Sequence, residues 1–91
     1  MTNMTQHAQV RMQQRGITMQ ALESLMVHGA VAYDHRGATI VYFDKKAKSR
    51  LQKIDGRHAY RAMEKQLNAY AVVAQDGVVV TVGRRDKRIP R

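Results

Sequence analysis

Residues 70–82 read Tyr-Ala-Val-Val-Ala-Gln-Asp-Gly-Val-Val-Val-Thr-Val, and this stretch decides the fold. Two runs rich in β-branched residues flank the pair Asp76-Gly77. An Asp-Gly pair between such runs is among the strongest short-range signals for a β-hairpin. We therefore predict antiparallel strands at 70–74 and 78–82, with Gly83 ending the second strand.

A second hairpin is predicted earlier in the chain, at residues 30–34 and 39–43. Both runs contain aliphatic and aromatic residues, and the turn between them contains Gly37. Strands of this composition on either side of a glycine-containing turn are typical of a hairpin. The two hairpins together predict a four-stranded antiparallel sheet.

Two helices are predicted before the first hairpin. Residues 5–15 form the first helix, which ends at Gly16, because glycine readily adopts the left-handed conformation that closes a helix. Thr18 is a suitable N-cap for the second helix, which Gly29 closes. The second helix presents one apolar face, made by Met19, Leu22, Leu25 and Met26.

The segment 45–66 separates the hairpins, and eight of its residues are lysine or arginine. Its apolar residues recur at helical spacing on either side of Asp55-Gly56, which predicts a broken helix; a basic loop that orders on binding is the alternative. The chain as a whole is predicted to be one α+β domain, residues 1–91. Two N-terminal helices pack on one face of the four-stranded antiparallel sheet, and a basic helical insert joins the hairpins.

The composition restricts the function. The chain has no cysteine, which excludes a disulfide framework and a thiolate nucleophile. No apolar run approaches the roughly 20 residues of a membrane span, and the first residues lack a signal-peptide hydrophobic region, so we expect a soluble cytoplasmic protein. Sixteen Lys and Arg against seven Asp and Glu give a net charge of +9. This excess indicates a polyanionic partner, either nucleic acid or an acidic protein.

Two basic clusters stand at the ends of the chain. His7, Arg11 and Arg15 are four residues apart, so on a helix they share one face and could bind one anion. Residues 84–91 contain five basic residues and form the second cluster. The alternative for either cluster is a solvated charged surface.

The first cluster also carries a family resemblance. The motif His-x-x-x-Arg-x-x-x-Arg-Gly-Ile is matched by His7, Arg11, Arg15, Gly16 and Ile17. With this motif and its order of elements, the chain resembles small bacterial domains related to RelE/ParE-type and BrnT-type toxins. The resemblance implies a sheet that cradles RNA, metal-independent cleavage, a cognate acidic antitoxin and, in many cases, the ribosome. ParE-type relatives act on DNA gyrase instead. The chain departs from the RelE pattern because it lacks a strand before the first helix and has the long basic insert.

Metal-independent RNA cleavage requires a base, a proton donor and cations that stabilise the phosphorane. His7 could serve as base or acid, because imidazole exchanges protons near neutral pH. Arg11 and Arg84 could hold the phosphate, since guanidinium groups match its oxygens. Tyr42 or Tyr60 could donate a proton or stack on a base. The predicted catalytic residues are His7, Arg11, Tyr42 and Arg84.

A further set of cations is predicted to contact nucleic acid without catalysis, and a solvated surface is the alternative for each. No metal ligands are predicted, because zinc requires three or four converging side chains and no two histidines lie within one helical turn of each other. No cofactor is expected. The predicted nucleic-acid contacts are Arg15, Lys45, Lys46, Lys48, Arg50, Arg85, Lys87 and Arg88.

The leading hypothesis is a toxin-like, metal-independent endoribonuclease of the mRNA interferase type, from a toxin–antitoxin system. One alternative is a non-catalytic basic domain that binds nucleic acid or an acidic protein. The other is a ParE-like toxin that inhibits a protein such as gyrase. The enzyme hypothesis requires His7, Arg11 and at least one of Arg84 and Arg85 to line one concave surface.

Overall fold

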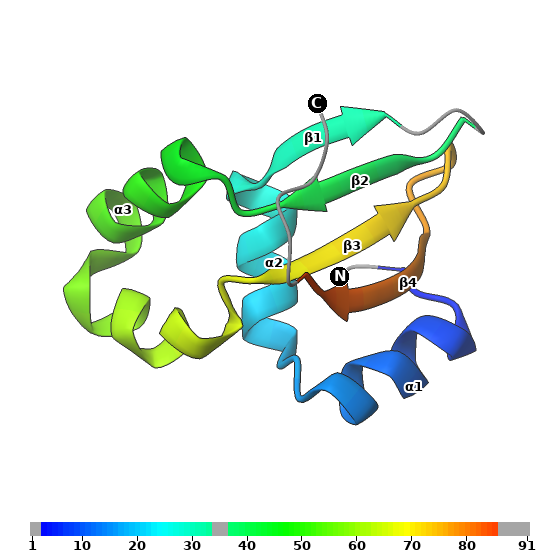
Figure 1. The fold of residues 1–91 in the computed structure, drawn as a ribbon, viewed down its shortest axis with the longest axis horizontal. Helices are drawn as coiled ribbons and strands as arrows, with labels where there is room; N and C mark the ends of the chain where they lie inside the picture. Colours follow the sequence, from blue (N-terminus) through cyan, green and yellow to red (C-terminus); the bar gives the residue numbers. More distant parts are fainter. Residues whose placement is uncertain (1–2, 34–36, 86–91) are drawn as a thin grey trace.

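The computed structural model describes residues 3–33 and 37–85, and at Asp55 the backbone alone. Within these described residues, four helices and four strands form an α+β domain, which confirms the fold class expected from the sequence (Figure 1). Their order is α1 (Gln6–Arg15), α2 (Met19–His28), β1 (Ala30–Tyr33), β2 (Thr39–Tyr42), α3 (Lys45–Met63), the 3₁₀ helix η1 (Glu64–Gln66), β3 (Ala69–Val73) and β4 (Val79–Arg84).

The two N-terminal helices begin and end where the sequence predicts. The Thr5 hydroxyl accepts a hydrogen bond from Ala8 N at 3.1 Å and so caps α1. Gly16 closes α1 in the left-handed conformation, with φ 65°. Thr18 caps α2 in the same way as Thr5 caps α1, by accepting from Ala21 N at 3.2 Å.

The sheet is an antiparallel meander in the order β1-β2-β3-β4. The Asp76-Gly77 turn joins β3 to β4: the Asp76 carboxylate accepts from Val78 N at 3.1 Å, and Gly77 has φ 88°. The predicted hairpins are therefore present, with strand ends shifted by one or two residues. Asp34, the predicted last residue of the first strand, lies outside the described residues.

A register irregularity at Val72/Val73 interrupts the pairing of β3 with β4. Val79 and Val82 are both buried, although strict alternation would turn residues three apart to opposite faces. The bulge thus reverses the alternation along β4, and Arg84 follows Val82 onto the helix-covered side. The prediction that Gly83 ends the last strand is wrong, because β4 continues through Gly83 to Arg84.

The predicted insert is helical on both sides of Gly56, which interrupts α3 with φ 87° and ψ 166°. This backbone conformation is essentially restricted to glycine, so the break follows from the residue type. Asp44 caps the first half by accepting from Ala47 N at 2.7 Å. Ala47 and Leu51 of the first half are fully buried, which fixes that half to the domain.

The main core lies between the sheet and the two N-terminal helices. α1 packs against β4, while α2 packs against β2, β3 and α3 (Figure 1). The largest buried side chains are Phe43, Leu22, Leu25, Leu51, Met63 and Val79. Among the described residues, no helix lies on the opposite face of the sheet.

The two edges of the sheet differ. At the β4 edge, Val79 N donates to Asn3 O at 2.9 Å and Thr5 N donates to Val79 O at 3.0 Å. Met4 and Val79 thereby form an isolated parallel bridge. The sequence predicted no strand before the first helix, and among the described residues that precede α1 only Met4 is bridged. The β1 edge has no such cover among the described residues.

Candidate nucleic-acid interface

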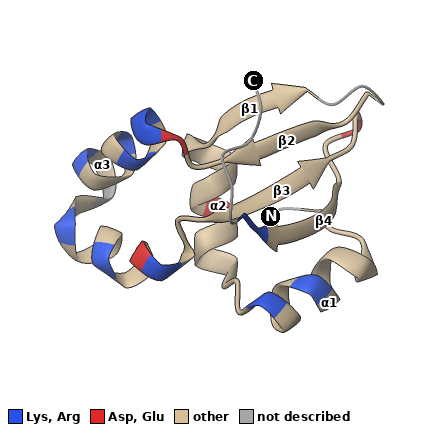
Figure 2. Cartoon of the chain, viewed as in Figure 1, with Lys and Arg blue, Asp and Glu red and all other residues tan. Residues whose placement is uncertain are grey.

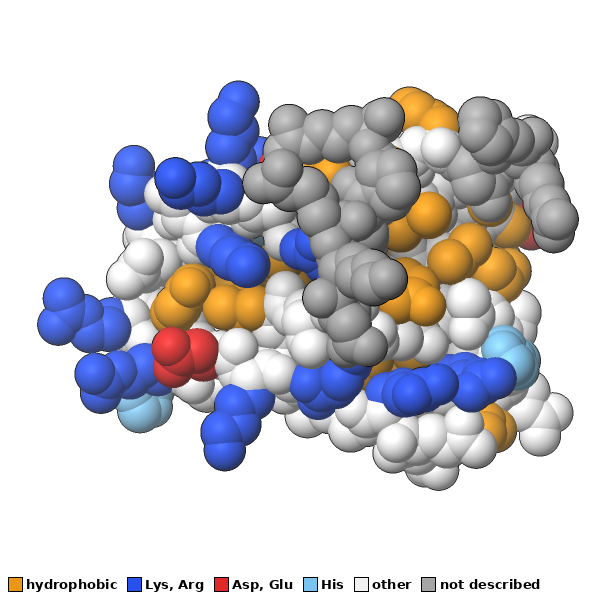
Figure 3. Space-filling model, in the orientation of Figure 1, with side chains coloured by type: hydrophobic (Ala, Val, Ile, Leu, Met, Phe, Trp, Pro, Cys, Tyr) orange, Lys and Arg blue, Asp and Glu red, His pale blue; other side chains and the backbone are white. Residues whose placement is uncertain are grey.

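The predicted basic row lies along α1. His7 and Arg15 are exposed and Arg11 is half-buried. Figure 3 shows basic side chains over α1, with a histidine at one end, along the border of the apolar side chains of the sheet. Within residues 3–33 and 37–85, none of these three side chains makes a hydrogen bond or ion pair. No described residue therefore competes with an anion for these three side chains.

Arg84 lies at the C-terminal end of α1, and the hydrogen bonds of its guanidinium group go to acceptors of the protein itself. Its Nε donates to Arg15 O at 2.7 Å and its Nη2 to Gly16 O at 3.2 Å. Its Nη1 donates to Lys65 O at 2.6 Å and to Asn68 Oδ1 at 3.2 Å. A positive charge at the C-terminus of a helix interacts favourably with the helix dipole. Arg84 thus joins α1 to η1 and to the start of β3.

His7 and Arg84 do not converge on one point. His7 is in the first turn of α1, whereas Arg84 contacts the carbonyls of Arg15 and Gly16 at its end. Arg15 follows His7 by eight positions along the helix, which corresponds to about 12 Å at a rise of about 1.5 Å per residue. One phosphate cannot contact both side chains.

Arg85 and Tyr42, two further predicted site residues, are in contact. The Arg85 guanidinium carbon lies 5.1 Å from the centroid of the Tyr42 ring, which is a cation–π arrangement. Arg85 Nη2 donates to Phe43 O, and its backbone N donates to Asn68 O at 2.9 Å. Its Nε is buried and has no hydrogen-bond partner among the described residues. Arg85 therefore covers Tyr42, which is only 6% exposed.

The helix-free face of the sheet contains an aromatic residue that the sequence reasoning did not single out. Tyr70 pairs with Tyr42 on one side and with Gly83 on the other. A Cβ at Gly83 would lie 2.7 Å from the Tyr70 hydroxyl, so the ring lies directly over the glycine. Tyr70 follows the inward-facing Ala69, and the alternation of β3 is the sequence signal that could have located it.

The next row of the same face consists of Ile40, Val72 and Thr81, which are paired across β2, β3 and β4. All three are half-buried, as is Tyr70. This surface, which we call the open face, is defined by Ile40, Tyr42, Tyr70, Val72 and Thr81. It is apolar apart from the threonine and the tyrosine hydroxyls.

The basic insert borders the open face on a second side. Lysine and arginine positions are spread along α3, beside the ends of the strands (Figure 2). Lys45, Lys46 and Arg50 are exposed and Lys48 is half-buried, and none makes an ion pair within the described part of the chain. A hollow of about 510 Å³ at the first turn of α3 is lined by Asp44, Lys45, Lys46 and Ser49. Lys87 and Arg88, the remaining predicted contacts, lie outside the described residues.

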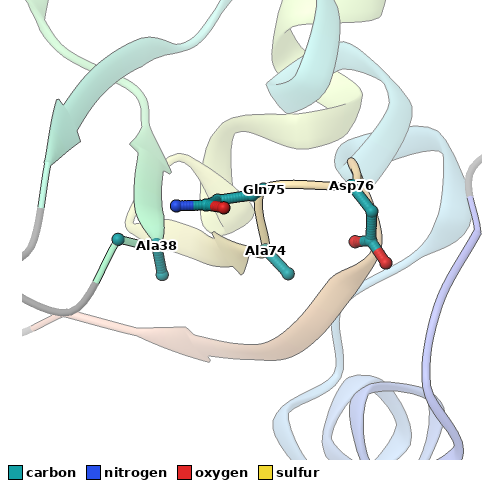
Figure 4. A pocket seen from close by; sticks show the side chains of 5 residues that line it. Ala38, Ala74, Gln75 and Asp76 are labelled. Carbon is teal, nitrogen blue, oxygen red and sulfur yellow. The ribbon is translucent and has the colours of Figure 1, made fainter.

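A second hollow, of about 450 Å³, lies between the two hairpin turns. Gly37, Ala38, Ala74, Gln75 and Asp76 line it, and the Gln75 side chain extends across it toward Ala38 (Figure 4). Its one carboxylate, that of Asp76, is engaged in the turn. This hollow contains none of the predicted site residues.

Among the described residues, no group of three or more His, Cys, Asp or Glu side chains could hold a metal ion. No helix in the described ranges is long and apolar enough to cross a membrane. Comparison of the chain with protein-family models, with curated proteins and with solved structures gave no match.

Proposed function

We propose that this protein binds single-stranded RNA on the open face of its sheet. One observation carries the proposal: the apolar open face is bordered by cations on α1 and on α3 that have no carboxylate partner in the described parts of the chain. The half-buried ring of Tyr70 lies among the residues of this face.

This arrangement matches the chemistry of an unpaired strand. Exposed bases stack on aromatic side chains, while the phosphate backbone follows a positively charged border. A duplex offers no free bases to an apolar sheet face, so its binding would use the cations alone. The net charge of +9 would add a non-specific attraction with a steep salt dependence. RNA, rather than DNA, is the target class implied by the resemblance to RelE-type toxins.

A matched pair of tyrosine variants tests the proposal. Tyr70→Leu removes the ring from the open face, and Tyr33→Leu removes a ring that is 82% exposed on β1. Binding of a twelve-residue oligouridylate is measured by fluorescence anisotropy. Tyr70→Leu should weaken binding by about 5- to 150-fold, the effect of one lost stacking contact of ~1–3 kcal/mol. Tyr33→Leu should bind as the wild type does, and equal losses in the two variants would refute the open face as the binding surface.

A metal-independent endoribonuclease of a toxin–antitoxin system is the second candidate, and the placement of His7 favours it. His7 is exposed one helical turn from Arg11, with no hydrogen bond to another described residue. A phosphate held by Arg11 would lie within reach of the imidazole, which could then exchange a proton with the 2′-hydroxyl. Neither Arg84 nor Tyr42 is required for this version of the site. An acidic antitoxin would be the expected partner.

Product analysis separates this candidate from simple binding. The wild-type protein should cleave single-stranded RNA in EDTA and leave a 2′,3′-cyclic phosphate, because the 2′-hydroxyl is the attacking group. His7→Ala should lower the cleavage rate about 10²-fold while oligouridylate binding is retained, as expected for a lost general acid or base. Expression of the His7→Ala variant in a bacterium should no longer arrest growth if RNA cleavage is the toxic activity. Intact RNA after incubation with the wild-type protein, with or without ribosomes, leaves binding as the function.

A further inference from the structure

The β1 strand forms an edge of the sheet that no other described segment covers. Its sequence, Ala30-Val31-Ala32-Tyr33, contains no charged residue and no proline, and its pairing with β2 has no bulge. Proteins commonly use those devices to prevent another strand from adding to an edge. The opposite edge, β4, is covered by hydrogen bonds to Asn3 and Thr5.

The hydrogen-bond pattern identifies which groups of β1 face outward. The backbone N and O of Val79 bond to Asn3 and Thr5 at the outer edge of β4, so both groups point away from β3. The facing residues Val73 and Val79 are therefore not joined by backbone hydrogen bonds. In antiparallel ladders such pairs alternate with hydrogen-bonded pairs. When hydrogen-bonded and non-hydrogen-bonded pairs are alternated in this way from β4 through β3 and β2 to β1, Ala32 and Ile40 form a hydrogen-bonded pair.

The backbone N–H and C=O groups of Val31 and Tyr33 therefore point away from the sheet. Neither residue makes a backbone hydrogen bond beyond the sheet among the described residues. Their side chains are also exposed, by 52% for Val31 and 82% for Tyr33, because α2 covers β2 and β3 and does not extend over β1. Val27, in the last turn of α2, is 73% exposed. The edge thus offers both backbone groups and apolar side chains to one incoming strand.

The charges near this edge indicate which kind of partner could bind there. Ala30 pairs with Tyr42, and only two residues separate Tyr42 from Lys45 at the start of α3. The exposed Lys45 and Lys46 therefore lie near the Ala30 end of β1, beside the hollow of about 510 Å³. A second copy of this chain would bring another net charge of +9 to the same edge, which opposes self-association.

We infer that the β1 edge binds an extended, acidic segment of a partner protein by β-strand addition. The backbone of Val31 and Tyr33 would bond to the added strand, and alternate apolar side chains of that strand would contact Val31 and Tyr33. Its acidic residues would lie toward Lys45 and Lys46. This surface is separate from the open face, so it does not depend on the RNA-binding proposal.

Selection from a library of displayed random twelve-residue peptides tests this inference with the full chain as bait. Enriched peptides should be acidic and should alternate apolar with polar residues. Val31→Glu should weaken their binding by about tenfold or more, as for a central interface residue, whereas the matched variant Ile54→Glu, on exposed Ile54 of α3, should change it less than about twofold. Lys45→Glu combined with Lys46→Glu should also weaken binding. Oligouridylate binding by Val31→Glu should equal that of the wild type.

Amide hydrogen exchange provides a readout specific to strand addition. The N–H groups of Val31 and Tyr33 should exchange rapidly in the free protein and about tenfold or more slowly with a selected peptide bound, because outward-pointing amides become hydrogen-bonded. The inference is overturned if no peptide is enriched, if the enriched peptides are not acidic, or if they bind Val31→Glu unchanged. It is also overturned if the two amides stay unprotected, or if Val31→Glu instead abolishes a dimer or the binding of RNA.

Discussion

The arginines at the end of β4 and those on α1 carry the same charge but are used differently. Arg84 donates four hydrogen bonds to acceptors of the protein, and Arg85 bonds to Phe43 O and covers Tyr42. Arg11 and Arg15 make no side-chain interaction among the described residues. The first pair therefore contributes to the fold, and the second pair is available for a ligand.

This difference shows why a count of basic residues overestimates a binding surface. A guanidinium whose donors are used by backbone carbonyls has little left to offer a phosphate, although its charge still adds to the long-range field. The comparison predicts that substitutions at the two places change different properties. Arginines at the end of β4 should affect stability, and arginines on α1 should affect binding.

The largest effect on stability is expected for Arg84→Ala. The substitution leaves the carbonyls of Arg15, Gly16 and Lys65 without their charged donor and separates α1 from η1. Hydrogen bonds to charged groups contribute about 1.5–3 kcal/mol each, and these are exposed to solvent, so we expect a total loss of only roughly 2–3 kcal/mol. Denaturant unfolding should show a lower midpoint with an unchanged slope. Arg84→Lys, which keeps the charge but not the fork of donors, should lose most of the same stability; full retention would mean that charge alone matters.

A smaller effect is expected at Gly83, where the Tyr70 ring occupies the space of a side chain. Gly83→Ala places a Cβ 2.7–2.9 Å from the hydroxyl oxygen and two ring carbons of Tyr70, so the ring must move, and we expect a loss of about 1 kcal/mol. In a Tyr70→Ala background the same substitution should stabilise by roughly 0.5 kcal/mol, because alanine loses less conformational freedom than glycine in a strand. A double-mutant cycle of unfolding free energies measures this reversal. Additive effects would show that the ring and the glycine do not interact.

Local signals in the sequence predicted most of the fold. Thr18 caps its helix, the Asp76-Gly77 turn joins two strands, and Gly56 breaks the insert, as their residue types indicate. Each of these features depends on residues within a few positions, so the sequence contains the information directly.

The site could be predicted only in part, because it depends on contacts between distant residues. Arg84 bonds to a carbonyl 69 positions earlier in the chain. The bulge between Val72 and Val73 decides which side of the sheet Arg84 and Arg85 face, and without it the two would exchange sides. No residue in β3 or β4 is of a type that predicts the bulge. The charge of the tail was therefore predictable, but the separate uses of its first two arginines were not.

The smallest effect on stability, and the clearest effect on binding, is expected for Arg11→Gln combined with Arg15→Gln. Neither side chain has a partner among the described residues, and glutamine keeps the helix propensity, so the unfolding free energy should change by less than about 0.5 kcal/mol. If each arginine contacts one phosphate, the slope of log affinity against log salt for oligouridylate should fall by about 1.4, since each contact with a single strand adds ~0.7. Arg84→Gln supplies the control, because it removes one charge whose donors are already used. The folded fraction of Arg84→Gln should show the wild-type slope of log affinity against log salt. If this slope decreases equally per removed charge at Arg84 and on α1, binding responds to net charge rather than to the row on α1.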